Sequence, residues 1–239
     1  MKESETDKIV RLDNVTKTFG SNGHRTVALR NASFHVSRGE LLVLLGPSGS
    51  GKTTLLTLIA GLLEPTSGKI SLFGRSIGHY TSKELQQLRA RRIGFVFQTF
   101  LLIDSLTAQE NVTLVLRFAG KARTEAQRRA HELLRQFQVA HLAEKFPPTL
   151  SQGEKQRVAV ARAFANGPDL IIADEPTGSL ESKQGLEIMQ LLQQYARDLN
   201  KCVVIATHDL RIAELAHRII RMEDGVLLQN TASTIRPVI

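Results

Sequence analysis

A glycine-rich segment in the first quarter of the chain has the composition and spacing of a phosphate-binding loop. Its residues, Gly46-Pro47-Ser48-Gly49-Ser50-Gly51-Lys52-Thr53, fit the pattern G-x-x-x-x-G-K-[ST]. Glycines let the backbone turn so that consecutive N–H groups face phosphate oxygens, and the N-terminus of a following helix adds partial positive charge. Lys52 can neutralise the β- and γ-phosphates, and the Thr53 hydroxyl can bind Mg²⁺. With the adjacent Thr54, the segment predicts a site for ATP and Mg²⁺.

The segments on both sides of this loop support that interpretation. Leu41 to Leu45 is apolar without polar alternation, which predicts a strand buried on both faces. Lys52 to Leu63 has helical periodicity. A phosphate loop requires this strand–loop–helix order, whereas a plain glycine-rich turn, the alternative, does not.

Polar residues also follow two later apolar runs. Asp174 and Glu175 end the run Leu170 to Ala173, and His208 follows Val203 to Ala206. In open α/β sheets, ligands bind at the carboxyl ends of parallel strands. Asp174 is therefore the expected partner of Mg²⁺, through its water shell, and Glu175 the expected general base for an attacking water. The His208 imidazole, at the same edge, can reach the γ-phosphate. A carboxylate pair without a metal and a purely structural histidine are the alternatives.

The order of the predicted elements indicates an α/β fold with a helical insertion. Short β-rich runs fill the first ninety or so residues, and strand–helix alternation returns after the middle of the chain, which predicts a parallel sheet with crossover helices. Between them, Thr124 to Phe137 and Ser151 to Ala165 have helical patterning. We expect one cassette over 1–239, with a core of 1–98 and 163–239 and a helical subdomain at about 99–162.

Composition limits the classes of protein that fit. The 239 residues, 42% of them hydrophobic, suffice for one core with a subdomain but not for two large domains. The opening, Met1 to Lys8, is charged, and no stretch approaches the roughly 18 apolar residues of a spanning helix. We expect neither a cleaved secretion signal nor a membrane channel. A lone cysteine, Cys202, agrees with a reducing compartment and also with a cysteine-poor secreted protein.

The net charge of +8 leaves several partners open. It suits a nucleic-acid binder, a protein close to anionic lipid headgroups, or a binder of polyanionic small ligands. Basic residues cluster at Arg89–Arg92, Lys121–Arg123 and Arg128–Arg129, a pattern that is also typical of a solvated helix face. Aromatic residues are sparse, so the stacking platform favoured by single-stranded nucleic acid is not evident.

A series of motifs in the second half of the chain resembles that of the ABC (ATP-binding cassette) ATPases. Leu150-Ser151-Gln152-Gly153-Glu154, followed by Lys155 to Ala163, resembles the signature motif of that family and the helix that it opens. The other matching motifs are the phosphate loop, Gln98 after Ile93–Phe97, Asp174-Glu175-Pro176-Thr177, Gly178-Ser179-Leu180-Glu181 and Thr207-His208-Asp209. Each string is weak alone, but their order and separations are very specific.

The resemblance implies a fold, a partner and further site residues. The fold is a P-loop NTPase core, a RecA-like parallel sheet plus an antiparallel β-subdomain, with an inserted helical subdomain. The partner is a second copy of the chain, so that Ser151, Gly153 and Glu154 of one subunit cover the γ-phosphate held by the loop of the other. Gln98 would bind the metal and the catalytic water, and Phe19 would stack on adenine. Gly178 and Ser179 would lie at the dimer interface.

Three residues depart from the family's usual pattern. Gln152 stands where the first glycine of the signature is usual, and Glu154 where many members have glutamine. Glu181 replaces the more usual aspartate. We interpret them as tolerated variations.

Within the family, the chain looks most like the macrolide-export, lipoprotein-release and FtsE-type group (MacB-, LolD- and DevA-like). This implies an ATPase that drives a separate integral membrane permease from the cytoplasmic face of the membrane, as an exporter or lipid-handling machine. The alternative is a soluble ABC ATPase that acts on nucleic acid or ribosomes. Such proteins generally carry two cassettes or a long coiled-coil insertion, so we expect no nucleic acid partner.

Overall fold

The computed structural model describes residues 7–20, 24–178, 180 and 182–232. The described residues form two compact units, one within 1–85 and 189–239 and one within 86–188. The boundaries between the units fall inside two helices, α2 (Ser82–Arg92) and α6 (Ser182–Asp198).

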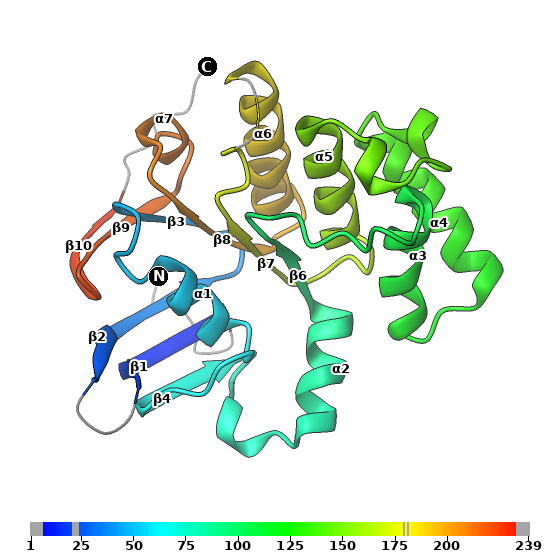
Figure 1. The fold of residues 1–239 in the computed structure, drawn as a ribbon. Helices are drawn as coiled ribbons and strands as arrows, with labels where there is room; N and C mark the ends of the chain where they lie inside the picture. Colours follow the sequence, from blue (N-terminus) through cyan, green and yellow to red (C-terminus); the bar gives the residue numbers. More distant parts are fainter. Residues whose placement is uncertain (1–6, 21–23, 179, 181, 233–239) are drawn as a thin grey trace. The chain divides into compact units, whose positions relative to one another are not determined.

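The first unit contains an antiparallel sheet in the order β2-β1-β4-β5. Its strands β1, β2 and β4 lie side by side in Figure 1. Apolar residues of β1, such as Val10, Leu12 and Val15, are buried, while Arg11 between them is exposed. This alternation is expected for a strand with one covered face. The bounds are β1 Lys8–Phe19, β2 Thr26–Ser37, β4 Ser67–Leu72 and β5 Arg75–Ser76.

The same unit contains parallel strands that hold the glycine-rich loop. Strand β3 (Leu41–Leu45) pairs in parallel with β8 (Cys202–Thr207) and β9 (Arg218–Glu223), and β10 (Val226–Ala232) is antiparallel to β9. Every residue of β3 and β8 is buried, as the uninterrupted apolar runs predict. Helix α1 (Lys52–Ile59) follows β3, and the short α7 (Leu210–Ala213) follows β8.

The second unit combines a parallel strand pair with a group of helices. Strands β6 (Ile93–Val96) and β7 (Leu170–Asp174) pair in parallel. Helices α3, α4 and α5, in green in Figure 1, contact one another. The rings of Phe137 and Phe164 pack edge to face, with their centroids 5.2 Å apart. The helices are α3 Ala108–Phe118, α4 Arg123–Gln136 and α5 Gln152–Ala163.

This architecture confirms the predicted fold class. The predicted elements exist, with shifted ends: α1 stops at Ile59 rather than Leu63, and α5 at Ala163 rather than Ala165. Gly61, with φ 63°, explains the first shift, because a left-handed residue ends a helix. Within the described part of the chain, no helix has the length and hydrophobicity needed to cross a bilayer.

Candidate functional site

The backbone of the phosphate loop has room only for glycine at two positions. A Cβ on Gly46 would lie 2.2 Å from the Met222 carbonyl oxygen, and one on Gly51 would lie 2.3 Å from that of Ala28. Gly51 also has a φ of 98°, a left-handed conformation that side chains disfavour. The loop is therefore held tightly between strands β2 and β9, and its path depends on the two glycines.

The loop and the helix that follows it fit a polyanionic ligand. Helix α1 begins at Lys52 with no side-chain cap and no acidic residue in its first turn, so its partial positive charge is not offset there. The Lys52 ammonium, in a largely buried side chain, donates to the carbonyl oxygens of Gly46 (2.8 Å) and Pro47 (2.9 Å). The buried Ser50 hydroxyl has no hydrogen-bond partner among the described residues. A cation, a buried hydroxyl and helix N–H groups are together the chemistry that binds phosphate.

The other predicted residues of the loop lie around this turn. Pro47, Ser48 and Gly49 are exposed at its tip, Thr53 is exposed in the first turn of α1, and Thr54 is half-buried. The positions of the two threonines follow from their place after Lys52, at the start of the helix.

Two further predicted residues lie in the same unit as the loop. The Gly46 N–H donates to the carbonyl oxygen of Thr207 at 3.2 Å, which places the next residue, His208, beside the start of the loop. His208 is exposed. At the end of β1, Phe19 is paired with Thr26 and is 41% exposed, with the Lys17 ammonium 5.1 Å from its ring centroid. Thr26 is two residues before Ala28, whose carbonyl oxygen faces Gly51.

In the second unit, the predicted acids and Gln98 lie at one edge of the strand pair. Val96 of β6 is paired with Ala173 of β7, so Asp174, the last residue of β7, and Gln98, just after β6, lie at the same edge. Asp174 is buried, Glu175 is half-buried and Gln98 is exposed.

Glu175 has an unusual backbone conformation. Its φ of 46° is left-handed, which is strained for a side-chain-bearing residue. Its carbonyl oxygen accepts a hydrogen bond from the Gly178 N–H at 3.1 Å, which closes the turn after the strand. Such strain is concentrated at functional sites in proteins. Ser179, predicted at a dimer interface, and Glu181, a departure from the family pattern, lie outside the described residues.

The signature residues form a capped helix N-terminus. The Ser151 hydroxyl accepts from the Glu154 N–H (3.3 Å), and the Glu154 carboxylate accepts from the Ser151 N–H (2.7 Å), which is a complete capping box. These hydrogen bonds, with a smaller contribution from His141, lower the pKa of Glu154 below its usual value. Gln152, a departure from the family pattern, is exposed at the first helical position.

Gly153 brings the start of α5 close to the start of α6. A Cβ at Gly153 would lie 2.9 Å from Gln184 Oε1 and 3.4 Å from Leu180 Cδ2. The signature residues also line a pocket of about 440 Å³. Its lining residues are Gln138, Val139, His141, Ser151, Gln152, Gly153, Glu154, Arg157 and Gln184. Sequence reasoning missed His141, Arg157 and Gln184, which come from separate segments with no motif of their own.

Sequence reasoning also assigned no role to Arg162, near the end of α5. Its guanidinium donates to the carbonyl oxygens of Phe100 (2.6 Å) and Leu101. Both acceptor residues are left-handed, with φ of 60° and 46°, and both closely follow Gln98. Burial lowers the pKa of Arg162 to about 10, so the side chain stays charged at neutral pH. Arg162 therefore joins the signature helix to the segment after Gln98, through partners sixty residues away in sequence.

Comparison with known proteins adds independent findings. The model of the family described as "ABC transporter" matches residues 29–178. The chain is 42% identical over 221 residues to MJ0796 of Methanocaldococcus jannaschii, an uncharacterised ABC transporter ATP-binding protein; the match covers 91% of this chain and 94% of the relative. A dimeric structure of MJ0796 in a post-hydrolysis state, bound to ADP and Pi, matches with a TM-score of 0.89 and 41% identity, over 93% of this chain and 98% of that one.

Two further relatives differ in their architecture. The putative hemin import ATP-binding protein HrtA of Staphylococcus haemolyticus is 41% identical over 218 residues, covering 90% of this chain and 97% of the relative. The macrolide export ATP-binding/permease protein MacB of Mannheimia succiniciproducens is 37% identical over 223 residues, covering 93% of this chain but 34% of MacB.

Proposed function

Because the chain belongs to the ABC transporter family, as an ATP-binding and ATP-hydrolysing subunit, we propose that it works as a homodimer that drives a separate integral membrane permease. The observation that carries the proposal is the loop before α1, where Lys52, the buried Ser50 hydroxyl and an uncapped helix N-terminus converge. The dimeric MJ0796 structure supports self-association, and the permease part of MacB supports a membrane partner.

In this proposal, the loop of the first unit holds the triphosphate. Backbone N–H groups of Gly46 to Thr53 bind phosphate oxygens, and Lys52 transfers its hydrogen bonds from loop carbonyl oxygens to the β- and γ-phosphates. Thr54, in the first turn of α1, also contacts the nucleotide, and Phe19 stacks on adenine. Thr53, Gln98 and Asp174 are the proposed Mg²⁺ ligands, all of them oxygen donors, as the ion prefers. Bound Mg²⁺ would neutralise phosphate charge.

Hydrolysis in this proposal depends on Glu175. The carboxylate accepts a proton from water as the water oxygen bonds to the γ-phosphorus, and the bond from that phosphorus to the bridging oxygen of ADP breaks. His208 donates to a γ-phosphate oxygen, and Gln98 orients the water. The left-handed backbone of Glu175 supports this role, because strain of this kind persists where position matters more than stability.

The signature residues act on the nucleotide of the partner subunit. Ser151, Gly153 and Glu154 line one pocket at the N-terminus of α5. The helix end attracts an anion supplied by a second copy, and the Glu154 carboxylate weakens that attraction. ATP bound to one subunit then stabilises the dimer until hydrolysis removes the γ-phosphate.

We place the chain on the cytoplasmic face of the cell membrane, attached through its permease, in the exporter or lipid-handling group. The similarity to MacB supports the group. The alternative of a nucleic-acid ATPase is disfavoured, because these relatives are transporter proteins.

The proposal is tested by Glu175→Gln. The amide cannot accept the proton of water, so turnover should fall about 10²- to 10⁴-fold while ATP affinity is retained. Phosphate release and nucleotide binding are measured on the purified chain, with the exposed Glu214→Gln as control. Unchanged hydrolysis in Glu175→Gln would refute the assignment. Affinity recovery of this variant from solubilised membranes with Mg-ATP should also yield an integral membrane protein, and its absence would count against the permease partner.

A further inference from the structure

The positive charge of the second unit is concentrated in one part of its sequence. Residues 86–136 contain nine Lys and Arg against four Asp and Glu, whereas residues 137–188 contain five against seven. Charge that served solubility alone would not need this asymmetry. The proposed ATP chemistry does not use the basic residues of 86–136.

Cations from three elements converge on the turn between α3 and α4. The guanidinium of Arg91, on α2, lies 4.0 Å from the position that a Cβ on Gly120 would occupy. Arg117, on α3, donates to the Lys121 carbonyl oxygen at 2.6 Å, and Arg123 opens α4. The side chains of Arg91, Arg117 and Arg123 are exposed.

The charge near this turn is only partly offset. Lys121 forms an ion pair with Glu125 at 2.5 Å, and both side chains are well exposed. Arg91, Arg117 and Arg123, which belong to separate elements, form no ion pair with any acid in the described part of the chain.

An aromatic residue, Phe118, lies between Arg117 and Lys121 in the sequence. Phe118, the last residue of α3, is 71% exposed, while Val112 and Leu116 of the same helix are fully buried. Phe118 therefore lies off the apolar stripe that packs α3, and it contributes little to the core. An exposed aromatic in a segment rich in Arg and Lys suits a membrane surface, where the ring enters the boundary of the acyl chains and the cations reach lipid phosphates.

We propose that this surface, which we call the α3–α4 surface (Arg91, Arg117, Phe118, Lys121 and Arg123), binds anionic lipid headgroups. Charge complementarity identifies the occupant, because an anionic leaflet attracts clustered Lys and Arg side chains. A surface with so few cations and one aromatic binds weakly and reversibly. It therefore orients the second unit toward the membrane, while attachment itself comes from elsewhere.

The test is sedimentation of the purified chain with two kinds of vesicle. One is phosphatidylcholine alone, and in the other about two lipids in five are the anionic phosphatidylglycerol. Saturating Mg-ATP keeps the phosphate loop occupied by nucleotide in both cases. The wild-type partition coefficient should be on the order of 10- to 100-fold higher with anionic lipid and should fall with added salt.

Two sets of variants separate the charges from the aromatic. Arg91→Gln/Arg117→Gln/Arg123→Gln should lose most of the preference for anionic vesicles, at about fivefold per cation. Phe118→Ser should weaken binding by about tenfold with little change in salt dependence. ATP hydrolysis should be unchanged in both, which also confirms that they are folded.

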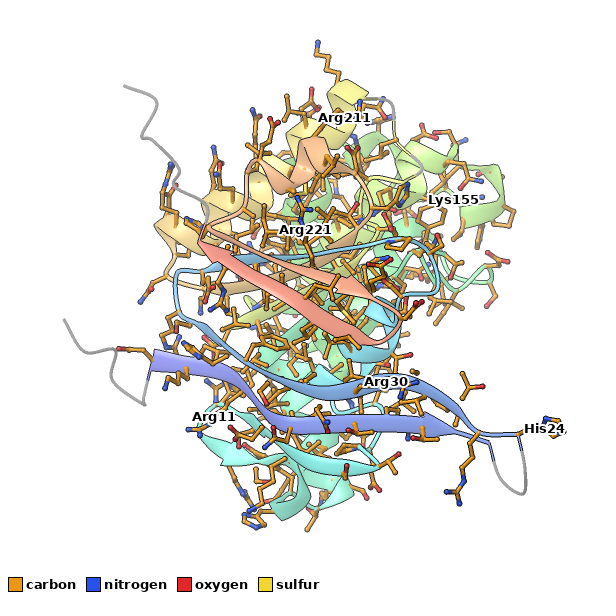
Figure 2. The ribbon with its side chains drawn as sticks, turned by 90° about the vertical axis from the view of Figure 1, so that its left-hand side faces the viewer. Arg11, His24, Arg30, Lys155, Arg211 and Arg221 are labelled. Carbon is orange, nitrogen blue, oxygen red and sulfur yellow. The ribbon has the colours of Figure 1, made fainter. Side chains whose placement is uncertain are left out.

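The matched controls are the same kinds of substitution at exposed residues of the first unit. They are Arg25→Gln/Arg30→Gln/Arg221→Gln, all exposed, with Arg30 and Arg221 labelled in Figure 2, and Leu199→Ser, which is 57% exposed. If the wild type does not prefer anionic vesicles, or the controls lose as much binding as the α3–α4 variants, the proposal is wrong. Lack of vesicle binding is also the result expected if an acidic protein face is the true occupant.

Discussion

Helices α1 and α5 both begin beside glycine-containing motifs, yet their N-termini are built differently. Helix α1 starts after Gly51, with no side-chain cap and no acidic residue in its first turn. Helix α5 starts after Ser151 with a complete capping box, in which the Glu154 carboxylate accepts a hydrogen bond from the Ser151 N–H. The first helix therefore leaves its donors to a ligand, while the second shares them with its own side chains.

This difference indicates a division of labour in binding the nucleotide. The α1 end has a buried lysine beside it, so it can bind phosphate strongly within one chain. The α5 end carries a carboxylate, which opposes a nearby anion. We therefore expect strong binding at the loop and a weaker, partner-dependent contact at the signature.

Among the variants that test this contrast between the two helix ends, Lys52→Ala should have the largest effect. Loss of a charged donor to phosphate should weaken ATP affinity on the order of 10- to 100-fold, measured by titration calorimetry. The exposed Lys69→Ala serves as the control, and it should bind ATP normally. Normal affinity in Lys52→Ala would remove the contrast between the two helix ends.

A smaller effect is expected from Ser151→Ala. Loss of the N-cap hydroxyl should lower the free energy of unfolding by about 1 kcal/mol, measured by urea denaturation, and should leave ATP affinity of the monomer unchanged. Ser151→Thr keeps a hydroxyl and should restore most of the stability. A drop in monomer ATP affinity would show that the signature binds nucleotide within one chain, against the proposed division.

The smallest effect is expected from Glu154→Gln. The amide keeps an acceptor for the Ser151 N–H but removes negative charge, so ATP-dependent dimerisation should strengthen about two- to fivefold, measured by analytical ultracentrifugation. Weaker dimerisation would instead assign the carboxylate a favourable contact with the nucleotide.

Glu154→Gln should also change how the free energy of unfolding depends on pH. Hydrogen bonds from Ser151 lower the pKa of Glu154 in the folded chain, so its ionised form stabilises the fold above the ordinary value of 4.5. That stabilisation is lost as the pH falls through the lower folded pKa. The stability of the wild type relative to Glu154→Gln should therefore decrease in this acidic range, and a constant difference would contradict the capping role.

The parts of the site that sequence analysis predicted are those set by local patterns. The phosphate loop, with its buried strand and helix, is continuous in sequence, so its conformation follows from neighbouring residues. The Asp174-Glu175 pair was found because a buried run ends there. The capping box was not predicted, although Ser151 and Glu154 have its spacing, because the same residues also fit the family signature, which implies a contact with nucleotide.

Long-range partners account for what sequence analysis missed. His141 reaches the signature pocket, and Arg162 reaches Phe100 and Leu101, across separations that no periodicity reveals. A polar residue in a helix gives no sign of which distant loop it holds.

The position of Arg162 has a consequence for how the chain tolerates sequence change. The carbonyl oxygens of two neighbouring left-handed residues, Phe100 and Leu101, accept from two separate nitrogens of one planar guanidinium. Lysine keeps the charge, but all of its donors lie on one nitrogen, so Arg162→Lys would not reproduce the spacing of the two guanidinium nitrogens. We therefore expect Arg162→Lys to lower activity, although the residue belongs neither to the proposed nucleotide site nor to the α3–α4 surface.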